Sequence, residues 1–585
     1  MKPETKKNLC VYWFAISSLC LLILFVYFTY EPVKVTIGME TLVIGTESGP
    51  HDLDPTDSWD KSSNDVIEQV VETLFTYDSR QYSIDETTPR INWLATGYSW
   101  DVTNTILTVD IRFGVEFHDG IIMDASVVAW NFNRFMYLMN HTGELPSNAA
   151  TVKVHSLYEF PDGTPIFQSI VASDVDTVVF TLNAPYAPIL DAMCYISCGI
   201  LSPASTPATE IIDLTGDIVG TGPYIYDYYI TDKEVRFTKF KDYWGAGVVE
   251  DEVTFDAMVY SVIQNTDSLN WAVIRGDVEA IFNPLPNYTS YFNTSPFVTY
   301  YEVDKPGLEY YFLSFNVKKI NFTWRKAMSY AIDYNKIIEV LLKDRAFRAY
   351  SAISQGYGTA FDSSLTNPIG GAAYNNLTIA RETILNGLSG DPLIDPRLQA
   401  NDTINDPLWL RTKLIEFNYS YNIDNPFRSD LFFVLKDSFK NIGVNLTDGG
   451  TNWDYFIPRA YGYVPTGFDD LEIFFLKRNP DYLDPFNMLF PLYSNNSDSN
   501  TCQINDHQIM KWFNDVLVET NQTARYEIYH RIQSRIFTQL YCHAPLFHNK
   551  ITYAHAADLY NVGYNCIGKW WALSVKRNLT WVPSL

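Results

Sequence analysis

The chain has few residues whose types and spacing could do chemistry, and His118 followed by Asp119 is the most obvious pair. An imidazole beside a carboxylate is a common combination for general acid–base catalysis. Here the pair precedes Gly120 and a predicted helix, an arrangement that is typical of a tight turn. No Gly-x-Ser-x-Gly or His-Glu-x-x-His sequence is present to supply a nucleophile or a catalytic metal. We therefore interpret the His-Asp-Gly segment as scaffold and expect no enzyme activity.

Five cysteines lie beyond residue 30, and their spacing does not predict a metal site. No Cys-x-x-Cys or His-x-x-x-His sequence occurs, and Cys194 and Cys198 alone would supply only two ligands. Because five is an odd number, at least one thiol stays free or pairs between chains. We expect up to two disulfides, with the pairing left open, and neither a metal nor a cofactor. The five residues are Cys194, Cys198, Cys502, Cys542 and Cys566.

The composition indicates a folded, acidic protein. Of the 585 residues, 47% are hydrophobic and 15% aromatic, which is ample for large cores. The formal net charge is −26, so a polyanion such as nucleic acid would be repelled. The acidity is typical of a protein that stays soluble in a salty or acidic exterior.

One unbroken apolar run, Leu9–Tyr30, contains no charged residue. As a helix, its 22 residues would extend for roughly 33 Å, enough to cross a bilayer. Lys2, Lys6 and Lys7 precede the run, so residues 1–8 are expected in the cytoplasm and the rest outside. No small-residue cleavage site follows the run, which favours a single-pass anchor over a cleaved signal peptide. Residues 31–40 would form a spacer.

Eleven Asn-x-Ser/Thr sequons lie beyond the predicted anchor, where glycosylation enzymes could reach them. Because Leu19 precedes Cys20, the context of a lipoprotein cysteine is also missing. Together these features favour an extracellular glycoprotein on an archaeal-type cell surface. The sequons begin at Asn140, Asn287, Asn293, Asn321, Asn376, Asn401, Asn418, Asn445, Asn495, Asn521 and Asn578.

Strand-like and helix-like segments alternate along the chain, which predicts an α/β fold with mixed sheets. The strands are expected at Leu42–Thr46, Ile106–Phe113, Thr177–Leu182, Tyr224–Tyr229, Glu234–Phe240, Tyr310–Phe315, Leu414–Asn418 and Leu471–Leu476. The helices are expected at Asn64–Leu74, Asp124–Tyr137, Trp324–Leu342, Pro426–Asn441 and over much of Asp506–Leu540. Asp124 is expected to be the N-cap of the second of these helices.

Four stretches with distinctive turn residues stand in a fixed order. They are Leu107–Gly120 with Met123–Val128, Val219–Tyr224 with Asp242–Gly245, Tyr310–Asn316 with Trp324–Asp333, and Asn479–Pro485. In this order and at these separations they resemble the family 5 extracellular solute-binding proteins of ABC transporters, the oligopeptide- and dipeptide-binding group. The resemblance covers about Leu42 to Lys576.

The resemblance implies a periplasmic-binding-protein-like fold of type II, with two lobes that close like a hinge over a ligand. The first lobe is expected at residues 41–305 with an inserted subdomain at about 90–200, and the second at 306–544. Residues 545–585 would return to the first lobe. The crossovers are placed near Asp304–Phe315 and His543–Ile551.

The resemblance also implies ligand-binding residues. Asp481 matches an aspartate that pairs with a peptide's α-ammonium group, although Asp-Tyr-x-Asp-Pro, with Tyr482, also shapes a turn in relatives with other ligands. Arg478 and Asn479 match an edge that hydrogen-bonds peptide backbone. Arg478 departs from the family pattern, where an aromatic residue is common, and either meets a ligand carboxylate or lies in solvent.

From the first lobe, Glu47, Ser48 and Gly49 match a loop that faces the cleft. Trp271 and Trp453 are expected in the core rather than in the pocket. The function implied is the capture of peptides, or of another small solute such as a sugar or metal complex, by a monomer. The partners implied are an ABC permease and its ATPase subunits. An extracellular hydrolase, or a sensory or adhesion receptor that reuses the fold, is the alternative.

Overall fold

The structure is a computed structural model. It describes residues 40–578 except for 79–89, 147–151, 153, 249–252, 367–375, 393, 395–397, 399–406, 424, 463–470, 496, 498, 563–566, 568–569 and 571. The predicted anchor, Leu9–Tyr30, lies outside the described residues. Within the described part, no helix is both long enough and apolar enough to cross a membrane.

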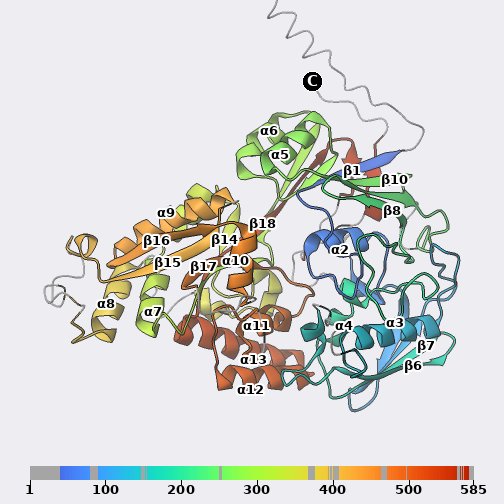
Figure 1. Cartoon of the computed structure of the whole chain (residues 1–585), viewed down its shortest axis with the longest axis horizontal. Coiled ribbons are helices and arrows are strands. Elements are labelled where there is room, and N and C mark those ends of the chain that lie inside the picture. The colour runs from blue at the N-terminus through green and yellow to red at the C-terminus, as the bar shows by residue number, and fades with distance from the viewer. Residues whose placement is uncertain are drawn as a thin grey trace, which may run out of the picture.

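A twelve-stranded mixed sheet runs through the molecule (Figure 1). Pairing is parallel between β1 and β10, and between β15 and its neighbours β16 and β17. The α/β fold with mixed sheets is therefore confirmed. In spatial order the strands are β16 (Val444–Thr451), β15 (Ile415–Asn422), β17 (Ile473–Arg478), β13 (Tyr310–Phe315), β18 (His543–Ala556), β11 (Ala280–Phe282), β1 (Thr41–Thr46), β10 (Ala257–Val262), β9 (Glu234–Lys239) and β8 (Tyr224–Ile230), with β12 (Val298–Pro306) and β14 (Ala346–Arg348) also paired to β18.

Strand β18 joins two regions of this sheet. Its first residues pair with β13, with Ser314 opposite His543, and its last residues pair with β11, with Ala280 opposite His555. We call β1 and β8–β11 the first sheet region, and β13 and β15–β17 the second sheet region. One continuous strand therefore hydrogen-bonds to both regions, which appear in Figure 1 as two bodies joined through β18.

Helices cover both regions. Around the second sheet region lie α7 (Phe322–Ala331), α8 (Leu377–Gly387), α9 (Pro426–Lys440), α10 (Trp453–Ala460), α11 (Pro485–Tyr493), α12 (His507–Val518) and α13 (Gln522–Ser534). Beside the first lie α2 (Lys61–Ile67), α5 (Thr266–Arg275) and α6 (Thr289–Thr294).

A separate four-stranded antiparallel sheet follows α2 in the chain. Its strands are β4 (Ala95–Trp100), β5 (Ile106–Ile111), β7 (Thr177–Leu182) and β6 (Phe167–Asp174), in that spatial order. Helix α3 (Ala125–Leu138) packs on it and buries Phe132 and Phe135. The Asp124 carboxylate accepts a hydrogen bond from Val127 N at 3.0 Å, so the predicted N-cap is confirmed. The short elements nearby are β2 (Phe75–Tyr77), β3 (Arg90–Asn92) and α4 (Ile189–Ala192), and β19 (Leu559–Tyr560) pairs with β20 (Lys576–Arg577) near the end of the chain.

Two predicted helices are shorter than expected. The helix predicted at Asn64–Leu74 ends at Ile67. Beyond it the carbonyls of Gln69 and Val70 accept hydrogen bonds from Tyr224 N and Gly222 N instead of continuing the helix. The helix predicted at Trp324–Leu342 ends at Ala331, and a π-helical turn follows at Lys336–Leu341. In both segments the buried side chains keep a helical spacing. The backbone, however, forms hydrogen bonds with distant parts of the chain, and these interrupt the α-helix.

The two parts of the molecule also touch far from β18. Ala187 N donates to Leu517 O at 2.8 Å, and Leu483 N donates to Tyr77 Oη at 3.0 Å. A single hydrophobic core accordingly extends from the first sheet region to α11, α12 and α13. The two parts are therefore joined both through β18 and through these contacts.

The four cysteines within the described residues, Cys194, Cys198, Cys502 and Cys542, are buried. Cys566 lies outside the described residues. No disulfide is formed among the described cysteines, so none of these four contributes to the number expected from the sequence.

Several sequon asparagines have a structural role as helix N-caps. Their side chains accept hydrogen bonds from the backbone two or three residues into the helix, as Asn321 does from Trp324 N at 3.1 Å. Asn376 and Asn521 make the same contact with Ile379 N and Ala524 N. Part of the sequon pattern is therefore explained by helix capping, and glycosylation stays a prediction.

The second aspartate of the Asn479–Pro485 stretch, Asp484, is a structural residue. It caps α11 by accepting from Phe486 N at 2.8 Å, and it pairs with Arg525 at 2.6 Å. Tyr529 Oη donates to the same carboxylate at 2.7 Å. Both charged residues are buried, so the charge of each would be costly without the opposite charge of the other.

We expect Asp484→Asn to lower the free energy of unfolding by about 3–5 kcal/mol, because Arg525 would be left buried without a counter-charge. The exposed pair of Lys511 and Asp515, 2.6 Å apart, offers a matched control, and Asp515→Asn should cost at most about 1 kcal/mol. Urea unfolding at pH 7 measures both. Equal losses in the two variants would contradict this role for Asp484.

His548 on β18 provides a test at acid pH. Its Nδ1 donates to Glu309 O at 2.8 Å, and burial lowers the pKa of His548 from 6.5 to about 4. A histidine with a lowered folded-state pKa contributes stability that is present above pH 6.5 and is lost as the pH falls towards 4. Between pH 7 and pH 4.5 we expect the wild type to lose about 2 kcal/mol more than His548→Gln. Urea unfolding at the two pH values measures this, and an equal loss in the wild type and in His548→Gln would refute it.

Candidate functional site

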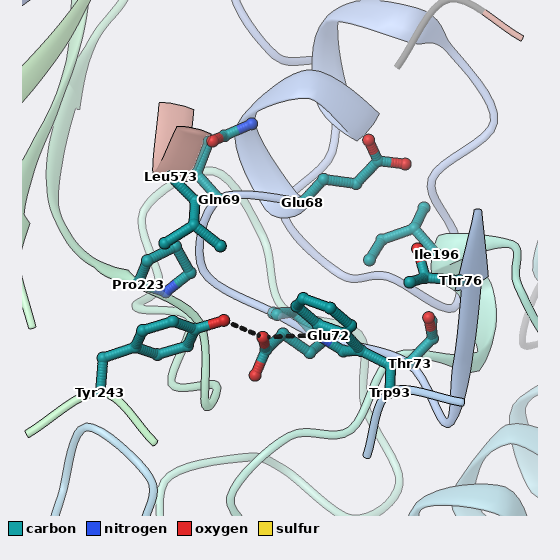
Figure 2. A pocket seen from close by; sticks show the side chains of 11 residues that line it. Glu68, Gln69, Glu72, Thr73, Thr76, Trp93, Ile196, Pro223, Tyr243 and Leu573 are labelled. Carbon is teal, nitrogen blue, oxygen red and sulfur yellow. Dashed lines mark hydrogen bonds between the residues drawn. The ribbon is translucent and has the colours of Figure 1, made fainter. Parts of the chain in front are cut away.

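Several polar groups in the first part of the chain converge on the buried carboxylate of Glu72 (Figure 2). Trp93 Nε1 and Tyr243 Oη donate to one of its oxygens at 2.7 and 2.8 Å. Thr221 Oγ1 and Trp244 Nε1 donate to the other at 2.6 and 2.7 Å. Burial raises the pKa of Glu72, and these four hydrogen bonds oppose the shift. Since every donor is neutral and engaged, we interpret Glu72 as a structural centre.

The His-Asp-Gly segment belongs to this scaffold. His118 N donates to Gly220 O at 3.0 Å, and His118 Nε2 lies 2.8 Å from Gly222 O. Asp119 accepts from the hydroxyls of Ser202 and Ser205 at 2.6 and 2.7 Å. The imidazole and the carboxylate therefore bind different partners, as expected for a turn. Burial lowers the pKa of His118 to about 4.

The candidate binding site lies at the carboxyl ends of the parallel strands β15, β16 and β17, where α/β proteins commonly bind ligands. Arg428 stands there in the first turn of α9, which carries no acidic residue. Its side chain is only 7% exposed, and its guanidinium lies 5.3 Å from the ring centre of Trp453 and 5.1 Å from that of Phe475. Among the described residues, Nε and Nη1 of Arg428 have no hydrogen-bond partner.

Two further polar groups near the end of β15 share this property. Tyr419 Oη and Asn422 Oδ1 are buried and have no hydrogen-bond partner among the described residues. Burial lowers the pKa of Arg428, and Tyr419, Tyr311 and Tyr461 oppose that shift. A buried cation without a carboxylate is costly, so the arrangement is that of a site for an anionic group.

The predicted residues Arg478 and Asp481 lie beside this site and contact each other. Arg478 Nη2 is 2.5 Å from Asp481 Oδ2, and Asn487 Nδ2 donates to the same oxygen at 2.9 Å. Burial raises the pKa of Tyr461, and the charges of Arg478 and Arg428 both oppose the shift, so Tyr461 lies near both arginines. Tyr461 thus lies between Arg478 and Arg428, a residue that we did not predict.

Tyr195, which follows α4 in the chain, lies near the pair. Burial raises the pKa of Tyr195, and the charge of Asp481 contributes to the shift. Asn64 Nδ2 on α2 donates to Tyr195 Oη at 3.2 Å, and Tyr195 donates to Ser58 O. The pair of Arg478 and Asp481 therefore lies where the two parts of the molecule meet.

The remaining predicted residues occupy different positions. Asn479 lines a cavity together with Lys61 of α2 and Glu309. Ser48 Oγ is 2.6 Å from Ser62 Oγ, next to Lys61 in the sequence, and so the Glu47–Gly49 loop lies beside α2. Glu47 is exposed, and Gly49 is buried against the ring of Tyr229, which leaves no room for a Cβ.

Tyr482 points away from these residues. It is 1% exposed and lies near Tyr186. Trp271 and Trp453 were expected in the core, but they are 37% and 44% exposed, so this expectation is wrong. Trp453 begins a short helix, and its indole covers Arg428 instead of entering the core.

Arg428 escaped prediction because the sequence shows it as a basic residue on an amphipathic helix, which is usually solvated. One cue was available, since Asn425-Pro426 starts a helix that has no acidic residue in its first turn. That cue indicates a positive helix end, but it does not show that the guanidinium is buried.

The chain belongs to the family described as bacterial extracellular solute-binding proteins, family 5 Middle, whose sequence model matches residues 90–500. The curated relatives include a glutathione-binding protein of Pectobacterium atrosepticum, 28% identical over 54% of this chain and 55% of the relative. A dipeptide-binding protein of Escherichia coli is 25% identical over 55% of this chain and 59% of the relative. The chain thus matches a little over half the length of these relatives.

Solved structures agree on the fold. A DppA protein of Helicobacter pylori in complex with the peptide STSA superposes with a TM-score of 0.72 at 20% identity. The superposition covers 92% of this chain and 98% of that protein. A dipeptide-binding protein from a Pseudoalteromonas species, bound to Met-Leu, gives the same TM-score and identity over 92% and 100% of the two chains. The periplasmic-binding-protein-like fold predicted from the sequence is therefore confirmed.

The unpaired charge of Arg428 makes a prediction for the protein without ligand. We expect Arg428→Met to raise the free energy of unfolding by about 1–2 kcal/mol, because a buried charge without a partner is removed. The matched control is Arg525→Met, which removes an equally buried arginine from its ion pair and should destabilise by about 3–5 kcal/mol. Urea unfolding measures both, and a clear loss of stability in Arg428→Met would contradict our interpretation.

Proposed function

We propose that this chain is a membrane-tethered receptor outside the cell that captures peptides, or another small solute, in the cleft between two lobes. The lobes are those expected from the sequence, residues 41–305 with an insertion at about 90–200, and 306–544, with 545–585 returning to the first. The Leu9–Tyr30 helix is the tether, and an ABC permease with its ATPase subunits is the recipient. The work is binding and closure, without covalent chemistry.

The observation that carries this proposal is the buried guanidinium of Arg428, which has no carboxylate beside it among the described residues. An acidic group of the solute would supply the missing counter-charge and form charge-assisted hydrogen bonds. The unpartnered Tyr419 Oη and Asn422 Oδ1 offer one hydroxyl and one amide acceptor close by. The names of the relatives, for glutathione and for dipeptides, fit a solute that carries carboxylates.

The surrounding residues suit a compound with an extended shape. Arg478 ends β17 and is followed by Asn479 and Asp481, and Glu47 and Ser48 stand beside α2 on the other side. We propose these residues as the two walls of the cleft. Tyr482 and Gly49 would support the walls from behind. Trp453, exposed beside Arg428, would cover the acidic group when it is bound.

Binding tests the proposal directly. The full-length chain in detergent is mixed with a pool of di- to tetrapeptides that carry free carboxylates, and with the same pool as carboxamides. We expect the acids to raise the melting temperature and the amides to bind at least tenfold more weakly, as the loss of a charge-assisted bond implies. Arg428→Gln should lose the preference for acids.

Lys511→Gln is the control for a change in surface charge, because Lys511 is exposed and lies on α12. It should bind both pools as the wild type does. If neither pool shifts the melting temperature of a folded wild-type protein, the proposed function is wrong for peptides. If Arg428→Gln binds acids as tightly as the wild type, the proposed role of Arg428 is wrong.

A further inference from the structure

This inference rests on the proposed function and concerns the chemical class of the solute. Asp481 is the carboxylate in the cleft that could select a positively charged group, yet it already has a cation. Arg478 Nη2 lies 2.5 Å from its Oδ2, and Asn487 donates to the same oxygen at 2.9 Å. The main-chain N–H of Asp481 donates to Asn487 Oδ1 at 2.8 Å, which fixes the orientation of the amide.

The chain itself holds this ion pair in place. Arg478 is the last residue of β17, and Asp481 follows three residues later in a turn that Asp484 and α11 anchor. Arg478 Nη2 also donates to Asn487 O at 3.3 Å. Since a guanidinium keeps its charge at every physiological pH, the pair does not depend on the protonation of Arg478. An amino group of a solute would have to displace Arg478 or sit beside it against like-charge repulsion.

The two arginines of the site therefore differ in their partners. Arg478 neutralises Asp481, while Arg428 stays without a carboxylate among the described residues. Two other ion pairs lie nearby, Lys477 with Glu309 at 3.4 Å and Lys61 with Asp65 at 2.8 Å. Arg428 is thus left for an acid, and Asp481 needs no cation from a solute.

We propose that Arg478 takes the place of a solute's amino group on Asp481. The cleft then selects carboxylic acids without requiring a free amino terminus, and its solutes include Nα-acylated peptides and other acids whose nitrogen is blocked. Arg478 is in this sense a specificity residue. Its side chain decides whether Asp481 is available to a solute.

The test compares two peptide pools that differ only at the amino terminus. Di- to tetrapeptides with free carboxylates are prepared with a free amine and with an Nα-acetyl group, and their affinities for the full-length chain are measured by calorimetry. We expect acetylation to change the affinity of the wild type less than threefold. In Arg478→Gln, which frees Asp481, the peptides with a free amine should bind at least tenfold more tightly than the acetylated peptides.

Two variants separate this role from a merely structural one. Arg478→Lys keeps a cation beside Asp481 and should retain the indifference of the wild type to acetylation. Asp481→Asn, combined with Arg478→Gln, should abolish the preference for free amines that Arg478→Gln creates. Circular dichroism and the melting temperature show whether each variant folds. If Arg478→Gln does not fold, the affinities of Arg478→Lys for the two pools decide whether the inference holds.

The outcomes distinguish the two proposals. A wild-type preference for free amines of tenfold or more overturns this inference, while the acid-over-amide preference at Arg428 can still hold. If the wild type binds neither the peptides with a free amine nor the acetylated peptides, the proposed function for peptides is wrong, and this inference with it. Equal binding of both pools by the wild type and by Arg478→Gln also overturns the role of Arg478.

Discussion

The fold depends on one strand. β18 forms backbone hydrogen bonds with β13 and β14 at its start and with β11 and β12 at its end, so two sheet regions share a single backbone. A rotation of one region against the other must therefore be absorbed along β18 or in the short link from β12 to β13. The relative positions of the two sheet regions are therefore limited. The positions of the residues that lie between the regions are limited in the same way.

Arg428 differs from other buried charges of the described residues in how the charge is satisfied. Asp484, for example, has partners in Arg525 and Tyr529. At Arg428 the chain leaves a cation to aromatic rings, although stability alone would favour an apolar side chain there. We propose that a group outside the chain completes it, and Arg428 therefore bears on function more directly than the polar cluster around Glu72.

The sequence predicted most strands because alternation and turn residues report burial on one face. β7 and β13 agree to the residue with Thr177–Leu182 and Tyr310–Phe315. The prediction from the sequence failed where contacts with distant residues determine the structure, as in the segment after Ile67 and at Trp453. The sequence motifs pointed to Asp481 and Arg478, but not to their contact with each other. Arg428 lacked any motif, since burial of a helix residue depends on which neighbours cover it.

Glu72 has a consequence for the order in which the chain can fold. Its four donors lie at Trp93, Thr221, Tyr243 and Trp244, up to 172 residues away in the sequence. Because the chain is made from its N-terminus, Glu72 is synthesised long before the last of these donors. Until they follow, water must solvate the charge. The four hydrogen bonds are therefore complete only after about 40% of the chain has been made.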